Sequence, residues 1–584
     1  MLYIGEFAKT AIYPFLPYSD SYSYFCWAKD IAGGQIWGAA AFMKWPLYAY
    51  FLAFLFKLFG ANLALIYAFQ FILGALNCIL VYLIARIIFE SRTAFFAGIF
   101  CACYGLFIFY EGLLVYSGLS VFLNSLFFLW LLNSNKNFSY SGLFFAGLLL
   151  GICTVTQANA AIFGILAVCW VLWSGKQKFR QLAVKFSVFL LGLSMVIGSA
   201  TLLNYLAEKD FVLLAGNTGF NFYSGNHPQA EGSFFCPKGV TRNQEDMFRD
   251  SRIIARAESG RNLKTSGVSR FWFNRAGKNF RENPARHLKL IFKKIALLFS
   301  PAEPIHDIEF EFIKDRIGIF RVVFMDLRFI LPLAFLGMIL AGKNFRQAFL
   351  LYLAIVVYAL SIVMFFVTAR YRLALVPFLA IFSGCAVSRL IDACKERNYF
   401  RCGLLGAVLI AFFALLNIKA RDKPVLNPQA AIEYYLIRAA IDEGNADYQS
   451  AMRLLQAAYG IEPSNYRVLT RMGVVNYNLH KLKEAEEKFK QVIKLCPFCV
   501  DAYYNLGFIY NQEKRFSEAR PMLERAISLD PENIPAHFEM AMVYKQEANF
   551  AQARKELQFV LWRLSRWRLQ DRNAAEEELR ELPE

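Results

Sequence analysis

Residues 500–533 read VDAYYNLGFIYNQEKRFSEARPMLERAISLDPEN, and they are one unit of a pattern that returns every 34 residues. The same spacing separates four alanines and three prolines, namely Ala451, Ala485, Ala519 and Ala553, and Pro463, Pro497 and Pro531. A period of this length is typical of stacked helix pairs, in which small residues let neighbouring helices pack closely and proline closes each pair. This part of the chain is therefore predicted to form an α-solenoid.

The quoted unit resembles the tetratricopeptide repeat, through Leu506, Gly507, Tyr510, Ala519, Ala526 and Pro531. Four repeats are expected, at 432–465, 466–499, 500–533 and 534–567, with a linker at 421–431 and a C-terminal helical cap at 568–584. Repeat arrays of this kind bind segments of other proteins on extended surfaces. The resemblance therefore implies a protein partner.

The rest of the chain has the composition of a membrane protein. Of the 584 residues of the whole chain, 57% are hydrophobic and only 18% are charged, against roughly a quarter charged in soluble domains. This excludes a disordered chain, a collagen, a small disulfide-rich domain and a simple soluble enzyme. A membrane helix needs about 20 mostly apolar residues, and candidate spans lie at 63–85, 94–110, 113–132, 141–156, 159–173, 183–204, 320–341, 347–367, 373–388 and 403–418. We therefore expect an all-α fold with a polytopic domain over residues 1–420.

The basic residues of the short connections predict the orientation of these spans. Thirteen Lys and Arg, from Arg86 to Arg401, lie on one side, and four lie on the other, namely Lys29, Lys44, Arg370 and Arg372. The richer side is expected to be cytoplasmic. A first loop at about 17–45, a large loop at about 205–319 and the repeats would then lie outside, as in a protein of the bacterial inner membrane.

Net charge and cysteine content add two restrictions. The charge of +18 fits the membrane topology, and because no nucleic-acid-binding motif is present we expect no nucleic-acid partner. The twelve cysteines are scattered, and the Cys496–Cys499 pair lacks the second pair that a zinc site would need. Residues 1–16 are too short to span a membrane and do not have the shape of a signal peptide, so either the chain starts late or this segment lies at the interface.

Three ionisable residues near the outer ends of the predicted spans are candidates for chemistry. Asp20 stands in the aromatic stretch PYSDSYSYF, where a carboxylate is either a general base or an ordinary loop residue making an Asx turn. Glu111 is either a second functional acid or a solvated turn residue. Lys44 is either a phosphate-binding cation or an anchor that reaches the membrane surface.

Two further stretches complete the candidate set. Arg370 and Arg372 begin a predicted span on the outer side, against the usual charge bias. The stretch 216–232, GNTGFNFYSGNHPQAEG, is rich in amides that suit a sugar, although turn formation alone would explain it.

Together these pieces resemble glycosyltransferases that use lipid-phosphate sugars, with the GT-C fold. The closest group is the protein-mannosyltransferase-like family, glycosyltransferase family 39, to which the lipid A aminoarabinose transferase is related. The resemblance rests on motifs in this order: Asp20 and Tyr24, Lys44–Tyr48, Glu111, the stretch 221–228, and Arg370–Leu373 with Pro377.

The resemblance implies transfer of a sugar from a polyprenyl-phosphate donor to an acceptor hydroxyl on the outer face, with inversion. Asp20 would be the general base, and Glu111 would be a second catalytic carboxylate that helps to position the donor or the acceptor. Lys44, Arg370, Arg372 and Tyr371 would bind the donor phosphate, and Tyr24, Asn221, Tyr223, Asn226 and His227 would line the substrate loop. The acceptor would be a protein, lipid or glycan, no cofactor is expected, and a requirement for a divalent metal stays open.

Two features depart from the family pattern. Ser21 follows Asp20, where some relatives carry a second acid, and the chain has no full span before the Asp20 loop. Two other functions remain open: a non-catalytic scaffold that gathers proteins through its repeats, and a lipid-linked glycan polymerase or ligase.

Overall fold

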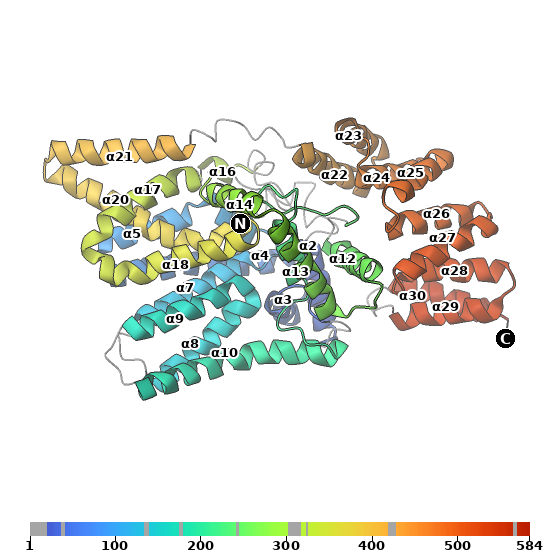
Figure 1. Ribbon diagram of the computed structural model, residues 1–584, viewed down its shortest axis with the longest axis horizontal. Helices are drawn as coiled ribbons and strands as arrows, with labels where there is room; N and C mark the ends of the chain where they lie inside the picture. Colours follow the sequence, from blue (N-terminus) through green and yellow to red (C-terminus); the bar gives the residue numbers. More distant parts are fainter. Residues whose placement is uncertain are drawn as a thin grey trace. The chain divides into compact units, whose positions relative to one another are not determined.

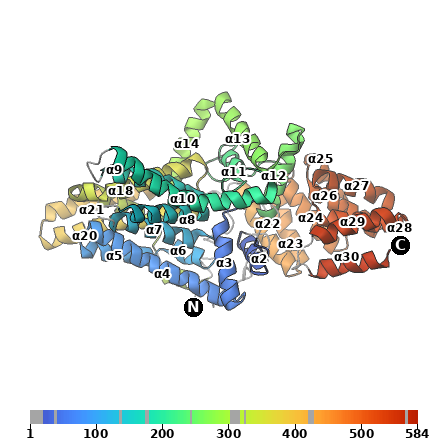
Figure 2. The ribbon, with the colours of Figure 1, turned by 90° about the horizontal axis from the view of Figure 1, so that it is seen from below.

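The chain forms two compact units in a computed structural model that describes residues 20–36, 41–133, 139–173, 179–240, 244–301, 317–322, 325–417, 428–563 and 569–583. The first unit comprises Met1–Phe235 and Leu263–Pro424, and the second comprises Cys236–Asn262 and Val425–Glu584. Both are built from helices (Figures 1 and 2). This confirms the predicted all-α class.

The first unit contains the apolar helices. Their bounds are α2 (Asp20–Ala32), α3 (Pro46–Phe59), α4 (Leu63–Ile88), α5 (Ser91–Ala102), α6 (Gly105–Glu111), α7 (Ser117–Asn133), α8 (Tyr140–Thr156), α9 (Phe163–Trp173), α10 (Phe179–Glu208), α17 (Leu327–Leu340), α18 (Phe345–Met364), α19 (Ala369–Arg372), α20 (Val376–Lys395) and α21 (Tyr399–Asn417). Among the described residues, five helical stretches are long and apolar enough to cross a membrane, with α19 and α20 counted as one. The unit is thus suited to a multi-pass membrane protein.

Small residues bring the helices of this unit together. A side chain at Gly147 of α8 would collide with the carbonyl of Phe189 in α10, and one at Gly192 of α10 would collide with the carbonyl of Phe144. The two helices lie side by side in Figure 2. Because lipid offers no hydrophobic driving force between membrane helices, such close backbone approach supplies their packing energy.

The predicted span 94–110 is interrupted rather than continuous. Helix α5 ends at Ala102 and α6 begins at Gly105. Between them, Tyr104 forms a single-residue parallel bridge with Met325, and the Gly105 N–H donates to the Met325 carbonyl at 3.1 Å. Pairing with a distant segment therefore breaks the helix, and α6 carries Glu111 at its end.

The large loop of the first unit contributes three more helices, α11 (Thr218–Gly225), α13 (Thr265–Glu282) and α14 (Pro284–Leu298). A short helix, α16 (Ile319–Val322), follows before α17. One further helix of the same loop, α12 (Gln244–Ser259), belongs to the second unit. Sequence patterns gave no indication of this division.

The second unit is a series of helix pairs that follow one another along the chain (Figure 1). The pairs are α22 (Pro428–Gly444) with α23 (Tyr448–Ile461), α24 (Tyr466–Asn478) with α25 (Leu482–Leu495), α26 (Val500–Gln512) with α27 (Phe516–Leu529), and α28 (Ile534–Gln546) with α29 (Phe550–Arg563), followed by α30 (Leu569–Glu581). Helices α24, α26 and α28 begin at the first residues of predicted repeats. The first pair begins four residues before the expected 432, because Pro428 is well suited to a first helical position.

The period of 34 is visible in the backbone as well as in the sequence. The left-handed residues Ala446, His480, Lys514 and Ala548, with φ of 60°, 60°, 60° and 57°, each follow the first helix of a pair. The four alanines spaced by 34 are fully buried. A side chain on Gly507 would meet Leu523 at 2.8 Å, so the first helix of that pair lies directly against the second.

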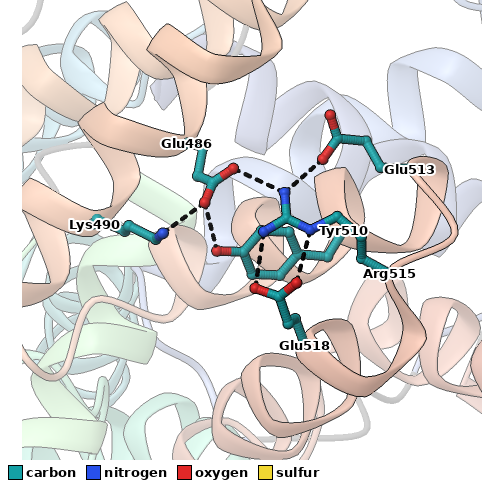
Figure 3. Close-up of polar contacts among 6 residues, drawn as sticks. All are labelled: Glu486, Lys490, Tyr510, Glu513, Arg515 and Glu518. Carbon is teal, nitrogen blue, oxygen red and sulfur yellow. Dashed lines mark hydrogen bonds and ion pairs between the residues drawn. The ribbon is translucent and has the colours of Figure 1, made fainter.

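A charged network joins three successive helices of the array (Figure 3). The Arg515 guanidinium donates to Glu486 at 3.0 Å, to Glu513 at 2.7 Å and to both oxygens of Glu518 at 2.8 Å. Its Cζ lies 4.1 Å from the Tyr510 ring centroid, and the Tyr510 hydroxyl donates to Glu486 at 2.9 Å. These contacts lower the pKa of Glu486 to about 2 against its burial, mainly through the hydrogen bond from Arg515.

Some expectations fall on parts of the chain outside the described residues. They include the segment 1–16, the beginning of the first loop at 17–19, and most of the linker predicted at 421–431. For these parts the sequence expectations stand as stated above.

Candidate active site

The centre of the candidate site is the carboxylate of Asp20, at the start of α2. Its Oδ1 accepts from the Lys44 Nζ at 2.8 Å, and its Oδ2 accepts from the Arg370 Nη1 at 2.6 Å. The side chains of Asp20, Lys44 and Arg370 are 7%, 12% and 6% exposed. Three segments that are far apart in the sequence therefore meet in one buried ion-pair cluster.

The elements around this cluster explain how the three side chains are held. Lys44 and Trp45 directly precede α3, whose first residue is Pro46. Arg370 lies in the short helix α19, where the Thr368 hydroxyl accepts from the Tyr371 N–H at 3.2 Å and caps the first turn. Cap bonds of this kind fix the start of a helix, and here they fix the direction in which Arg370 leaves the backbone.

Tyrosine rings form part of the surroundings of both cations. The Lys44 Nζ lies 5.4 Å from the Tyr24 ring centroid, and the Arg370 guanidinium lies 5.2 Å from that of Tyr116. The Tyr24 ring is perpendicular to that of Tyr48 at 5.1 Å. Cations are attracted to such ring faces, more strongly where water is excluded. The cluster of Asp20, Lys44 and Arg370 carries one positive charge in excess, which favours an anion with one negative charge.

Glu111 lies outside the ion-pair cluster. Its carboxylate packs against Gly74 of α4, where a side chain would collide with it, and in the described residues it forms no ion pair with Lys44 or Arg370. The link between the two places is Gln70, whose Nε2 donates to the Glu111 carbonyl at 2.7 Å and whose Oε1 accepts from the Tyr48 hydroxyl. Glu111 therefore supports the cluster only through its backbone in this arrangement.

Arg372 points away from Asp20, although the sequence grouped it with Arg370. Its Nη1 donates to the carbonyls of Leu297 at 3.3 Å and Ser300 at 2.6 Å. Residues two apart on a helix project in different directions, so the two arginines separate. Arg372 thus holds the end of α14, whereas Tyr371 lies close enough to Asp20 and Arg370 to interact with them electrostatically.

The predicted substrate-loop residues other than Tyr24 gather on and after α11. Tyr223 is buried, with its ring 4.8 Å from that of Trp272 and 5.2 Å from that of His227. His227 stacks on Phe235 at 4.2 Å, and burial, with help from Arg275 and Arg286, lowers its pKa to about 4. Its imidazole is therefore neutral near pH 7. Asn221 is half-buried on the same helix.

Asn226 binds a buried lysine that the sequence did not single out. The Lys294 Nζ donates to the Asn226 Oδ1 at 2.9 Å and to the Phe365 carbonyl at 2.6 Å. Lys294 is fully buried, and burial lowers its pKa to about 7. The Asn226 amide also donates to the Met364 carbonyl at 3.0 Å. These bonds connect α11 and α14 to the end of α18, five residues before Arg370.

Sequence reasoning missed Gln70, Tyr116 and Lys294, and it included Tyr48 only as the last residue of the Lys44–Tyr48 motif. Gln70 did give a signal, because a polar residue within an apolar span usually has a polar partner. Lys294 gave none, since it stands among several other basic residues of the large loop. Within the described ranges, no group of three or more His, Cys, Asp or Glu residues is suited to bind a metal ion.

Comparison with known families adds an independent observation. Residues 43–200 match the dolichyl-phosphate-mannose-protein mannosyltransferase family. The match indicates a membrane glycosyltransferase domain and includes Lys44 and Glu111. Asp20 precedes the matched range, and Arg370 follows it. Residues 500–533 match the tetratricopeptide repeat. Both resemblances predicted from the sequence are thereby confirmed.

Solved structures similar to part of the chain include three proteins. A fragment of MamA from Desulfovibrio magneticus is 20% identical, with 26% of this chain and 92% of that chain covered and a TM-score of 0.22. PilF of Pseudomonas aeruginosa is 16% identical, with 33% and 86% covered and a TM-score of 0.23. YrrB, described as a tetratricopeptide protein with an unusual peptide-binding site, is 21% identical, with 26% and 81% covered and a TM-score of 0.22. No curated protein matches the chain.

Proposed function

We propose that the chain is an integral membrane glycosyltransferase that moves a sugar from a polyprenyl-phosphate donor to an acceptor hydroxyl. The observation that carries this proposal is the buried cluster in which each oxygen of Asp20 meets one cation, Lys44 or Arg370. A base and two phosphate-binding groups are the parts that such a transfer needs. The family match of residues 43–200 supports the reaction class.

The reaction follows from the roles of these three side chains. The acceptor oxygen attacks the anomeric carbon from the side opposite the phosphate, and the bond from that carbon to the phosphate oxygen breaks. Asp20 takes the acceptor proton as general base, and polyprenyl phosphate leaves with the bonding electron pair. Lys44 and Arg370 stabilise the charge that develops on the phosphate. The configuration at the anomeric carbon is inverted.

The ion pairs of Asp20 make the base dependent on the donor. A carboxylate bonded to two cations is a weak base, because nearby positive charge favours its ionised form. A phosphate that binds Lys44 and Arg370 competes for the same N–H groups. Donor binding therefore releases Asp20 from its partners and makes it basic when the sugar is in place.

Other residues have supporting roles in this proposal. Tyr24 and Tyr371 border the cluster, and Arg372 acts as a positioning residue that keeps α14 close to α19. Tyr223, Asn226 and His227 shape the loop that follows α10. Glu111 stabilises the Gln70 contact and acts on substrate only if its carboxylate turns away from Gly74. The proposal includes no cofactor, because side-chain cations would bind the phosphate, and a requirement for a divalent metal stays open.

The membrane orientation also belongs to the proposal. The excess of Lys and Arg in the opposite connections favours an outer location for Asp20, the large loop and the repeats. The donor would then enter from the outer leaflet, whose anionic lipid carriers the basic loop 238–294 attracts. The repeats would bind a protein partner outside the bacterial inner membrane.

Transfer by the purified full-length protein tests the function. The protein is reconstituted in vesicles with a panel of radiolabelled polyprenyl-phosphate sugars, and release of polyprenyl phosphate is measured. Asp20→Asn is expected to reduce the rate by about 10²–10⁴-fold, the usual contribution of a general base. The control is Asp210→Asn, which changes a carboxylate that accepts from the Ser266 N–H at 2.7 Å at the start of α13. Equal rates for the Asp20 variant and the wild type would refute the role of Asp20.

A further inference from the structure

Helix α12 is part of the large loop in the sequence but packs within the unit that contains the repeats. The residues on both sides of its segment, Phe235 and Leu263, belong to the first unit. Both ends are anchored there: Phe235 stacks on His227 at 4.2 Å, and the Ser266 hydroxyl donates to Asp210 at 2.6 Å. The chain therefore leaves the first unit to contribute one helix to the second and then returns.

The apolar part of the contact is made by Ile253. It is buried in a cluster formed with Val500, Tyr503, Ala526 and Ala536. These four residues come from α26, α27 and α28, and therefore from two successive repeats. An isoleucine side chain is largely removed from water there, which favours association.

The charged part of the contact is made by Arg249. Its Nη2 lies 3.1 Å from the Asp501 Oδ1, and its Nε lies 3.7 Å from the Asp530 Oδ2. Asp530 is 9% exposed, and burial raises its pKa despite the opposing effect of Arg249. A buried carboxylate without a cation is unfavourable, so this site favours a basic side chain.

Arg249 and Ile253 are four residues apart and therefore lie on one face of α12. We call the surface that they contact the α12 seat, and it consists of Val500, Asp501, Tyr503, Ala526, Asp530 and Ala536. The segment before α12 extends the contact, because the Tyr466 hydroxyl donates to the Val240 carbonyl at 2.6 Å. The α12 seat thus has one apolar part and one acidic part, at the spacing of one helical turn.

We propose that the α12 seat is a helix-binding site of the repeats that α12 fills in cis, and that a partner protein occupies it by displacing α12. The partner would present a helix with an arginine followed four residues later by an aliphatic residue. This chemistry matches the apolar and acidic parts of the seat. The proposal does not depend on the reaction proposed for the first unit.

Displacement has a definite consequence for the loop. Because α12 is tethered at both ends, its effective concentration at the seat is high, on the order of millimolar for a flexible tether. A partner must therefore bind the seat with high affinity or be present at a high local concentration. When it does, residues 236–262 are released, while the anchors at His227 and Asp210 keep both ends of the segment in the first unit.

A peptide-binding experiment on the full-length protein tests the proposal. A fluorescent peptide of residues 236–262 is titrated into detergent-solubilised wild type and into the variant Arg249→Glu/Ile253→Asp, whose own α12 no longer fits the seat. The variant is expected to bind the peptide at least tenfold more tightly, because its seat is vacated. Arg261→Glu, a change of an exposed arginine at the end of the same segment, should behave as the wild type.

Two additions make the outcome decisive. Adding Asp501→Lys to the double variant should abolish peptide binding if the seat is the binding site. A second measurement needs no variant: excess ¹³C-labelled peptide should increase hydrogen exchange of residues 244–259 of the unlabelled wild-type protein. The label distinguishes the added peptide from the protein's own α12. Equal affinity of wild type and double variant, or unchanged exchange, would refute the proposal. If light scattering shows a dimer for the wild type and a monomer for the double variant, α12 of a second copy fills the seat instead.

Discussion

Replacing Asp20 with asparagine should strengthen binding of the leaving group while it removes catalysis. In the wild type, a phosphate must take Lys44 and Arg370 from Asp20, whose bonds to them are 2.8 and 2.6 Å long. A hydrogen bond that involves a charged group contributes about 1.5–3 kcal/mol, and one between neutral groups contributes about 0.5–1.5 kcal/mol. An asparagine amide has a single accepting oxygen, so with asparagine the phosphate displaces one such bond instead of two. The gain of about 2 kcal/mol corresponds to at least about tenfold tighter binding.

The same variant should be less stable without ligand. Removing one member of a buried ion pair costs about 3–5 kcal/mol, because the remaining charge is left in the interior. Thermal unfolding of the detergent-solubilised protein, with and without a short-chain polyprenyl monophosphate, measures both effects. Asp20→Asn should unfold at a lower temperature than the wild type and gain more stability from the ligand. Asp210→Asn should show the wild-type ligand effect. If Asp20→Asn gains less from the ligand than the wild type, the competition between Asp20 and phosphate is refuted.

Four further predictions concern packing and titration. Gly147→Ala should destabilise the protein by about 1–3 kcal/mol, as overpacking does, because its methyl group overlaps the backbone carbonyl of Phe189; a chemical denaturation curve checks this, and an unchanged midpoint would contradict the packing. Arg515→Ala should destabilise the repeats by about 1–2 kcal/mol, given about 0.2–1 kcal/mol for each exposed pair. The melting temperature, followed by circular dichroism, would be unchanged if the network did not stabilise the repeats. The folded pKa of Glu486 is lowered to about 2. Its contribution to the stability of the repeats is therefore fully present above its unfolded pKa, about 4.3, and is lost as the pH falls towards 2. Since burial lowers the pKa of Lys294 to about 7, stability should rise between pH 7 and 10 in the wild type and rise less in Lys294→Met; equal slopes would contradict this.

The repeats were predictable from the sequence to within a few residues because their contacts are local. Each helix packs against the next one in the chain, so alanines such as Ala519 recur at a fixed spacing and reveal the fold directly. The break at Tyr104 was not predictable, because it depends on Met325, far away in the sequence. Apolar composition alone describes a continuous span there.

The candidate site was predictable only in part, for a similar reason. Asp20, Lys44 and Arg370 were found because they are ionisable residues at the ends of apolar stretches. Arg372 shares that property, and only the direction of its side chain separates it from Arg370. The position of α12 depends on pairs such as Arg249 with Asp501, and no local pattern in a sequence records a contact across 252 residues.

The contact between Asp20 and Arg370 joins residues 350 positions apart, and this has a consequence for biogenesis. During synthesis, the first of these residues leaves the ribosome long before the second exists. Until the late span arrives, the acidic group lacks its guanidinium partner, and every truncated product that ends before that span lacks it permanently. In the proposed reaction, catalytic competence should therefore appear only when membrane insertion is nearly complete, so that incomplete chains cannot consume lipid-linked sugar.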